Sequence, residues 1–523
     1  MRLSLPIRST CAVTALMVVV AGASNATGDP GRGRLVQVSS DDPLVDCTAD
    51  FPDLQPGTRF PASEVEPWVA VNPTNPDNIV ATWQQDRWST GGARAAGVAV
   101  SLDGGKKWQT FLMPNLTFCT GGTAFRSTDP WLSFSPDGTL HHMSLLLGPG
   151  TNAMVVQSST DGGFTWSDPI PLVESAIPLL NDKNSLTADP IDSMLVYAVW
   201  DQLDLVNGGG PALLSRSTDG GMTFSAPAAI HDPGPTAQTI GNQIVVLPDG
   251  TAINFFNEIF FAPSFTQTLA LKYSEDQGAS WQPGGPAGPS IPVAAMLPTF
   301  DLVDPDQGQP IRGANFLFDV GVDPVEGTLA AVWQDGRFNG FQYDAVAFSL
   351  STDGGLTWST PVQVNQTPED VPIVNRQTFV ASVEFNEKGR IAVTYYDFRR
   401  NDAGPGALTD HWAITCNSRK VDCTDPSQWS GELRLTKKSF DILAAPLTTT
   451  GFFVGDYVGL AAAGNDFVAL FGASHDDDPA SLFVRVFDEG PKRKGTGNNA
   501  AKVQPLNVAV PRSTPDSGPL TSN

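Results

Sequence analysis

Carboxylates that could perform acid–base or metal chemistry stand just before apolar segments of this chain. They are Glu66, Asp129, Asp182 and Asp456. A glycoside hydrolase needs two carboxylates across a cleft, because one protonates the leaving oxygen while the other acts as base or nucleophile. The same four side chains, with backbone carbonyls, could instead hold a Ca²⁺ ion. The sequence contains no EF-hand, H-E-x-x-H, P-loop, G-x-S-x-G or Rossmann motif, so we expect no cofactor other than Ca²⁺.

Other charged residues occupy equivalent positions around the same apolar segments. Those that follow a second segment include Arg87, Asp201, Glu258, Arg337 and Arg399, and those that precede a first segment include Arg126 and Arg376. Apolar segments that end in carboxylates and guanidinium groups at equivalent points predict a polar funnel at one end of the structure. Ion pairs between neighbouring sheets are the alternative use of these side chains, and the sequence leaves both open.

The apolar segments occur in pairs separated by a turn, and the pair recurs seven times. The pairs are 68–72 with 79–83, 131–134 with 140–145, 185–188 with 195–200, 243–247 with 252–256, 318–322 with 329–333, 380–385 with 391–396, and 457–461 with 467–471. Their alternation and their β-branched and aromatic content predict strands. Trp83, Trp200 and Trp333 end second segments in three copies, which favours shared core positions over sugar-stacking platforms. His141 and His142 lack a metal-ligand partner at useful spacing and are expected to pack.

A short motif, S-x-D-x-G-x-T-W, follows the third predicted strand of the first five units. Its aspartates are Asp103, Asp161, Asp219, Asp276 and Asp353, which are 58, 58, 57 and 77 residues apart. The carboxylate can accept hydrogen bonds from its own turn, and the glycine permits a positive φ. A catalyst needs one site, whereas this motif occurs five times. We therefore interpret it as a structural turn that marks a repeated unit.

Four antiparallel strands in each of seven units predict an all-β, seven-bladed β-propeller. The seventh unit lacks a fourth strand, and residues 35–39 resemble the fourth strand of the fifth unit. We therefore expect residues 35–39 to pair with 482–487, which closes the ring and leaves no exposed sheet edge. In the sixth unit, the segment from Cys416 to Cys423 replaces the turn motif. An insertion, 283–313, accounts for the longer spacing of 77 residues.

The ends of the chain and its cysteines predict a secreted protein, either extracellular or periplasmic. Arg2 and Arg8 precede an apolar run, so residues 1–26 are expected to be a signal peptide, followed by the propeller at 35–490 and a disordered tail at 491–523. Cys416 and Cys423 are close enough to close a small loop, and Cys47 and Cys119 would then pair by elimination. Without Arg2 and Arg8, 29 basic and 55 acidic residues give a net charge of −26, which disfavours nucleic acid and anionic membranes as partners.

With these residues in view, the turn motif resembles the Asp box, or BNR repeat, of sialidases, over about residues 60–490. Sialidases typically have six blades, so a six-bladed propeller is the alternative fold. The resemblance implies three arginines that hold the sugar carboxylate, a Tyr nucleophile activated by a Glu, and an Asp as acid/base. The candidates are Arg87, Arg337, Arg376 and Arg399 for the arginines, Tyr396 or Tyr457 for the nucleophile, Glu66 or Glu258 for its partner, and Asp129 or Asp456 among the acids. The segment Pro310-Ile-Arg312 has the letters of a sialidase motif in another order and place, and we do not assign it.

Three functions are compatible with these features. The first is a secreted, sialidase-like glycoside hydrolase that acts on a glycan in the polar funnel. The second is a non-catalytic extracellular propeller that binds a glycan, a cell-surface glycoconjugate or a protein. The third is a structural module without a small ligand. In each case we expect a monomer without a membrane span.

Overall fold

The computed structural model describes residues 33–39, 42–299, 302–475 and 478–488. This part of the chain is all-β, and its helical segments are 3₁₀ turns of three residues. Because the predicted signal peptide and the whole of the predicted tail lie outside the described residues, both stay predictions. Within the described part, no helix has the length and apolar character required to cross a bilayer.

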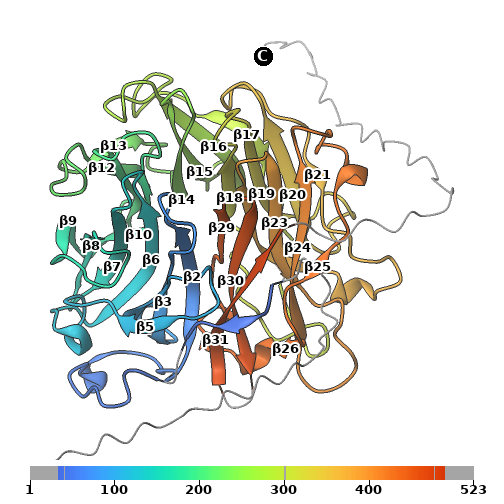
Figure 1. The fold of residues 1–523 in the computed structure, drawn as a ribbon, viewed down its shortest axis with the longest axis horizontal. Coiled ribbons are helices and arrows are strands. Elements are labelled where there is room, and N and C mark those ends of the chain that lie inside the picture. The colour runs from blue at the N-terminus through green and yellow to red at the C-terminus, as the bar shows by residue number, and fades with distance from the viewer. Residues whose placement is uncertain (1–32, 40–41, 300–301, 476–477, 489–523) are drawn as a thin grey trace, which may run out of the picture.

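Antiparallel sets of four strands are the building unit (Figure 1). The first set contains β2 (Glu64–Val71), β3 (Ile79–Arg87), β4 (Ala93–Ser101) and β5 (Gln109–Leu112). The second contains β6 (Arg126–Phe134), β7 (Leu140–Leu147), β8 (Thr151–Ser159) and β9 (Ile170–Ala176). The pairing of Ala93 with Ser127 joins these two sets into one sheet. Three separate sheets are β10 (Leu179–Ala188), β11 (Val196–Asp204), β12 (Ala212–Ser217), β13 (Ala228–His231); β14 (Ala237–Val246), β15 (Ala252–Phe260), β16 (Thr266–Ser274), β17 (Ile291–Ala295); and β18 (Phe318–Val322), β19 (Leu329–Asp335), β20 (Ala345–Ser351), β21 (Val362–Gln363).

The last sheets include strands from both ends of the described chain. One contains β22 (Thr378–Phe385), β23 (Arg390–Asp397), β24 (Leu408–Asn417) and β25 (Leu433–Arg434), with β26 (Phe440–Asp441) also paired to β24. The other has the order β1 (Val36–Gln37), β31 (Asp478–Phe487), β30 (Asp466–His475), β29 (Gly459–Ala463). A short hairpin, β27 (Leu447–Thr448) and β28 (Gly451–Phe452), precedes β29. Val36 pairs with Val484 and Gln37 with Phe483, which confirms the predicted pairing of the two ends; Figure 1 shows β1 in blue beside β31 in orange-red.

The first strand of each set lies next to the first strand of the following set. The order of neighbours is β2, β6, β10, β14, β18, β22, β29, and β29 in turn lies next to β2. Side chains link these strands: Trp68 donates to the carbonyl of Leu132, and Ser185 donates to that of Asn242. The apolar core fills the spaces between neighbouring sets, where Trp83, Trp200 and Trp333 are each at most 1% exposed, as expected for core positions.

The S-x-D turns have the predicted geometry. In the second copy, Ser159 Oγ donates to Asp161 Oδ1 over 2.8 Å, and the backbone N–H groups of Phe164 and Thr165 donate to the same oxygen. Gly163 adopts a φ of 101°, which a residue with a Cβ would resist. The carboxylate thus satisfies its own turn, and its role is structural. His141 and His142 are buried, and burial lowers their pKa values to about 4 and about 3.

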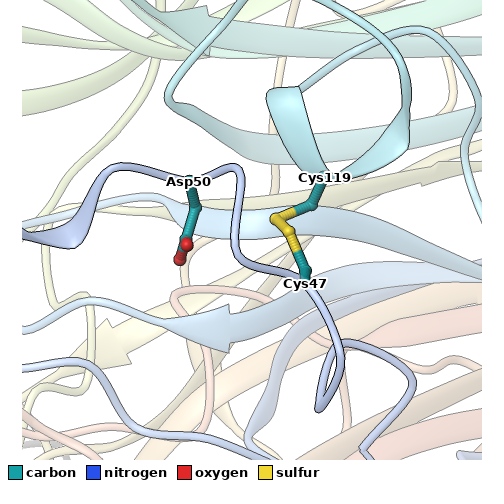
Figure 2. Close-up of side chains that lie close together, drawn as sticks. All are labelled: Cys47, Asp50 and Cys119. Atoms are coloured by element: carbon teal, nitrogen blue, oxygen red, sulfur yellow. A yellow bond between two sulfur atoms is a disulfide. The ribbon is translucent and has the colours of Figure 1, made fainter.

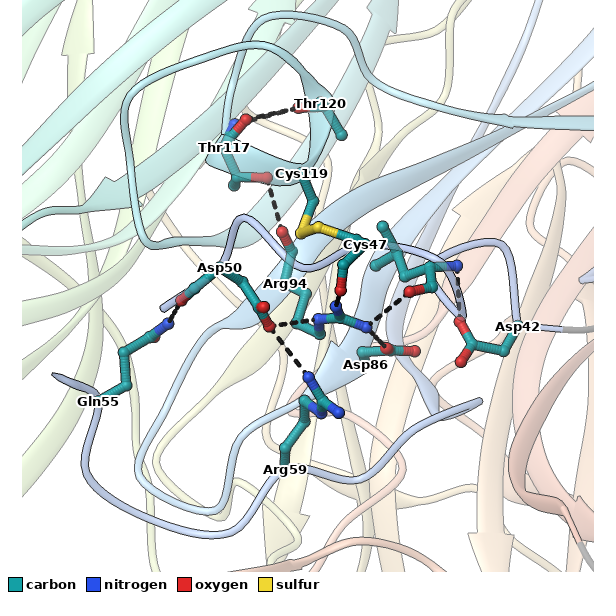
Figure 3. Close-up of a disulfide and its surroundings, with 11 residues drawn as sticks. Asp42, Cys47, Asp50, Gln55, Arg59, Asp86, Arg94, Thr117, Cys119 and Thr120 are labelled. Carbon is teal, nitrogen blue, oxygen red and sulfur yellow. Dashed lines mark hydrogen bonds and ion pairs between the residues drawn. A yellow bond between two sulfur atoms is a disulfide. The ribbon is translucent and has the colours of Figure 1, made fainter. Parts of the chain in front are cut away.

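Both predicted disulfides form, Cys47 with Cys119 and Cys416 with Cys423. The first ties the N-terminal segment to the loop after β5 (Figure 3). Arg94 reinforces this link, because its guanidinium donates to Asp50 over 2.6 Å, to Asp86 over 2.9 Å and to the carbonyl of Cys47 over 2.8 Å. Next to the second disulfide, Trp429 Nε1 donates to the carbonyl of Cys423, so this indole packs against the disulfide-closed loop.

Candidate functional site

The first strands share a backbone irregularity that determines where their charged side chains point. Strands β2, β6, β10, β14 and β22 each contain a register shift about three residues after they begin to pair. A residue with positive φ lies in each shift: Glu66 (53°), Asp129 (47°), Lys183 (43°), Gly241 (70°) and Val380 (50°). A bulge of this kind redirects a side chain out of the normal alternation. Three neighbouring strands, β2, β6 and β10, thereby present Glu66, Asp129 and Lys183 to one another.

These three side chains and Asp456 form a buried charge cluster, which we call the axial cluster. Lys183 Nζ lies 2.5 Å from Asp456 Oδ2, 3.5 Å from Glu66 Oε1 and 3.6 Å from Asp129 Oδ1. None of the four residues is more than 8% exposed. Gln84 on β3 donates to Glu66 Oε2 and to Thr128 Oγ1, which fixes the Glu66 carboxyl against β6.

Two arginines complete the cluster on its outer side. Arg312 Nε donates to Asp456 Oδ1 over 2.7 Å, and a second Arg312 nitrogen pairs with Asp456 Oδ2. The guanidinium groups of Arg87 and Arg312 lie 4.9 and 4.7 Å from the centre of the Phe453 ring. Arg312 belongs to the insertion, whose residues Pro310 to Arg312 hydrogen-bond to Phe452 through the backbone. The Arg312 side chain is 23% exposed, so it connects the cluster to solvent.

The environment separates the pKa values of these carboxyls. Burial raises the pKa of Glu66 to about 8, although Lys183 opposes this effect. Burial also raises the pKa of Asp129. Burial alone would raise the pKa of Asp456 too, but Lys183 and Arg312 hold it well below its usual range. At neutral pH Glu66 therefore carries a proton while Asp456 is ionised. Two carboxyls with separated pKa values in one site are the arrangement found in acid–base catalysis.

An aromatic layer lies directly beyond the cluster along the same strands. Trp68 and Trp131 stack with ring centroids 3.5 Å apart, and Tyr457 meets both rings edge-on at 6.0 and 5.4 Å. Each of these aromatic residues follows a cluster carboxylate by one or two positions in the sequence. Burial raises the pKa of Tyr457 well above its usual value, so its hydroxyl stays protonated. A cavity of about 20 Å³ beside Trp68, Asp456 and Tyr457 is the size of one water molecule.

The structure brings together five of the residues named from sequence: Glu66, Asp129, Asp456, Tyr457 and Arg87. The other three predicted arginines do not converge on this cluster in the described part of the chain. Arg337 pairs with Asp335, Arg376 donates to the carbonyls of Glu369 and Val371, and Arg399 pairs with Asp397 and Glu432. Arg337 and Arg399 thus form ion pairs with nearby carboxylates, and Arg376 hydrogen-bonds to backbone carbonyls close in sequence. In the described part of the chain, these three arginines therefore do not join Arg87 in the three-arginine arrangement implied by the sialidase resemblance.

Three other predicted residues also lie outside the axial cluster. Tyr396 is fully buried and its hydroxyl donates to the carbonyl of Gly472, so it is a core residue. Glu258 accepts from His231 over 2.7 Å and from Ser290 over 2.8 Å. Asp182 accepts from the backbone N–H of Lys183, and its charge helps to raise the pKa of the buried Asp201.

A metal ion has one geometric candidate among the described residues, and its chemistry excludes it. Cys47, Asp50 and Cys119 lie close together (Figure 2). The two sulfur atoms form a disulfide, so neither is a thiolate ligand, and Asp50 pairs with Arg59 and Arg94. In the axial cluster, the ammonium group of Lys183 lies between the carboxylates that a Ca²⁺ ion would use. Calcium binding there stays a prediction.

The contributions of Lys183 and Arg312 were not assigned from sequence. A signal for Lys183 exists: Glu66-Pro67-Trp68 and Asp129-Pro130-Trp131 are copies of one pattern, and Lys183 occupies the acidic position in the next unit. Arg312 had no such signal, because it lies in an insertion without a repeat. Its place is set by backbone pairing with Phe452, which is distant in sequence.

Comparison with known proteins adds structural similarity only. No protein-family model matches the chain, and no curated protein matches it. Among solved structures, a Dyadobacter fermentans protein of unknown function is 14% identical (TM-score 0.42), with 88% of this chain and 100% of the other covered. A Penicillium chrysogenum α-L-arabinanase is 13% identical (TM-score 0.45; 88% and 99%), and polysaccharide lyase Uly1 is 12% identical (TM-score 0.49; 88% and 99%). At these values the similarity does not extend to an activity.

Proposed function

We propose that this protein is a secreted, seven-bladed β-propeller whose axial cluster cleaves glycosidic bonds by acid–base chemistry. The observation that carries the proposal is the meeting of Glu66, Asp129 and Asp456 around Lys183. A buried group of this kind is costly to maintain, because each charge must be removed from water.

The neighbour relations of the first strands support seven blades arranged in a ring. Seven sets of strands follow one another, and the seventh set meets the first through β29 and β2. The pairing of β1 with β31 joins the two ends of the described chain in that last sheet. In a ring of this kind the first strands surround a central axis, which explains why residues far apart in sequence share one cluster.

The proposed reaction assigns roles to Glu66, Asp456 and the two cations that contact Asp456. Glu66, protonated at neutral pH, gives its proton to the leaving oxygen as the C–O bond at the sugar breaks. Asp456, ionised at the same pH, stabilises the positive charge that develops on the sugar ring. A water oxygen then bonds to the sugar carbon, and its proton returns to Glu66. Lys183 and Arg312 keep Asp456 ionised, and the partly exposed Arg312 borders the approach for substrate.

Activity measurements on a panel of glycans test this assignment. The purified protein would be incubated with aryl glycosides and with neutral and uronic-acid polysaccharides, and released reducing ends would be measured between pH 4 and pH 9. We expect Glu66→Gln to lower the rate by about 10² to 10⁴, the usual contribution of a general acid. Glu258→Gln is the matched control, because Glu258 is a buried carboxylate paired with His231 outside the cluster. Equal losses in both variants, or no turnover of any glycan by the wild type, would overturn the proposal.

A non-catalytic glycan-binding propeller is the second candidate, favoured by the low exposure of the cluster carboxylates. In that case a glycan array would show binding by the wild type without turnover, and Arg312→Ala would abolish the binding.

A further inference from the structure

A second cavity lies on the other side of the aromatic layer from the axial cluster. It has a volume of about 570 Å³, within the range of small-molecule sites, and residues from all seven first strands line it. The lining continues along each strand from the bulge to the turn before the second strand, where Pro73, Pro136 and Pro190 stand. The S-x-D turns lie at the same end. Asn78, in the turn between β2 and β3, donates to the carbonyl of Gly162, which belongs to an S-x-D motif. We call this cavity the turn-side channel.

The wall of the turn-side channel is largely apolar. The partly exposed lining residues are mostly apolar and include Ala70, Val71, Val245, Val322 and Ala462. The hydroxyl groups in the wall are engaged: Thr187 donates to the carbonyl of Ile244, and Ser185 to that of Asn242. The wall therefore suits a hydrocarbon group better than a sugar, whose many hydroxyls would find few free partners.

Two carboxylates, Asp319 and Glu384, are the ionisable side chains among the residues that line the channel, and none of those residues is Lys, Arg or His. Within the described chain, neither carboxylate forms an ion pair with a basic side chain. Asp319 is held by Ser382 Oγ and by the backbone N–H of Val383 over 2.9 Å. Glu384 Oε1 accepts from the backbone N–H of Phe385, while its Oε2 has no hydrogen-bond partner among the described residues.

Ionisation of these two carboxyls in an apolar wall is unfavourable unless a cation is nearby. Burial raises the pKa of Glu384 to about 8, and Asp319 adds to the increase. Burial also raises the pKa of Asp319, to about 6. A cationic group next to Glu384 Oε2 would relieve both effects, since an opposite charge favours the ionised carboxylate.

We propose that the turn-side channel binds a small apolar molecule with one ammonium group, which contacts Glu384 while the hydrocarbon part lies along the apolar wall. The volume, the wall and the two carboxylates without a cationic partner carry this inference together. It does not depend on glycan cleavage, because the aromatic layer of Trp68, Trp131 and Tyr457 separates the channel from the axial cluster.

Calorimetric titration with three probes of equal chain length tests the proposal. The probes are octylammonium, 1-octanol and octanoate, each titrated into the full chain at pH 8.5. We expect saturable 1:1 binding of octylammonium with a Kd at least tenfold below that of either other probe. Glu384→Gln should remove this difference and leave 1-octanol binding unchanged. Glu174→Gln, which removes an exposed carboxylate on the outer strand β9, is the control for overall charge and should preserve the difference.

Several results would overturn the inference. They are octanoate binding as tightly as octylammonium, the absence of saturable binding by octylammonium, or an equal effect of Glu384→Gln and Glu174→Gln. If circular dichroism shows that Glu384→Gln does not fold, Asp319→Asn takes its place. The asparagine oxygen can still accept from the backbone N–H of Val383, although its amide nitrogen cannot accept from that of Val320, so we expect that variant to fold and to lower octylammonium affinity at least threefold.

Discussion

Replacement of Lys183 by methionine should destabilise the protein in a manner that depends strongly on pH. Methionine has nearly the same length but no charge, so the variant leaves Asp456, Asp129 and Glu66 buried without their shared cation. Removal of one partner from a buried ion pair costs about 3–5 kcal/mol. The loss has a ceiling, because the variant can protonate the carboxylate instead.

The ceiling follows from the pKa of an aspartate in the unfolded chain. Protonation of that group costs about 1.36 kcal/mol for each pH unit above about 3.9. For one carboxylate that is ionised in the wild type and protonated in the variant, the ceiling on the loss of stability is therefore about 4 kcal/mol higher at pH 8 than at pH 5. The sign agrees with the pKa shift of Asp456 in the wild type. Because its pKa is lower in the folded protein than in the unfolded chain, Asp456 contributes stability at pH values above its unfolded pKa. This contribution is lost as the pH falls through its folded pKa. Glu66, with a raised pKa, is protonated at pH 5 in both proteins.

Urea unfolding, followed by tryptophan fluorescence, measures the loss in free energy of unfolding at pH 5 and at pH 8. Lys272→Met is the matched control, because Lys272 is equally buried but donates to the backbone carbonyls of Pro283 and Gly285. We expect the Lys183→Met loss to grow at least twofold from pH 5 to pH 8 and the Lys272→Met loss to stay nearly constant. A Lys183→Met loss that is the same at both pH values would refute the reasoning that the ammonium keeps Asp456 ionised.

Two further changes test the disulfides and the S-x-D turns, which stabilise the fold around the axial cluster. Removal of the Cys47–Cys119 disulfide by two serines should lower the free energy of unfolding by about 4 kcal/mol, against about 2 kcal/mol for Cys416–Cys423. The reason is loop length, 72 residues against 7, and equal losses of thermal stability would contradict it. Asp161→Ala should cost about 1 kcal/mol, because the turn loses the acceptor for Phe164, Thr165 and Ser159. Asp161→Asn keeps an oxygen acceptor and should lose less than half as much in a melting curve.

Much of the fold could be predicted because its signals are local and repeated. The alternation of the strands and the five S-x-D turns each depend on residues close in sequence. The pairing of Val36 with Val484 was also predictable, since a missing strand in the last unit needs a partner and the N-terminal segment had none. The disulfides followed from the count of cysteines. In each case few alternatives satisfied the same local chemistry.

The site was harder to predict because its members meet through backbone geometry. Arg87 was named from sequence with three other arginines in equivalent positions, yet those three pair with nearby carboxylates or carbonyls. A guanidinium at the end of a strand has many possible partners within one sheet, and sequence does not rank them. Arg312 was missed for the opposite reason, since its insertion has no counterpart in the other units.

The left-handed residues in the first strands show which part of the site is structural and which is chemical. Val380 has a φ of 50°, although a β-branched residue resists this conformation, and no charged group is present at that position. The bulge therefore belongs to the packing of first strands around the axis, whatever the side chain. Glu66, Asp129 and Lys183 differ from Val380 only in the chemistry they present from the same backbone position. Three adjacent charged residues on a feature that tolerates valine and glycine are not required by the fold, so their presence is the stronger indication of function.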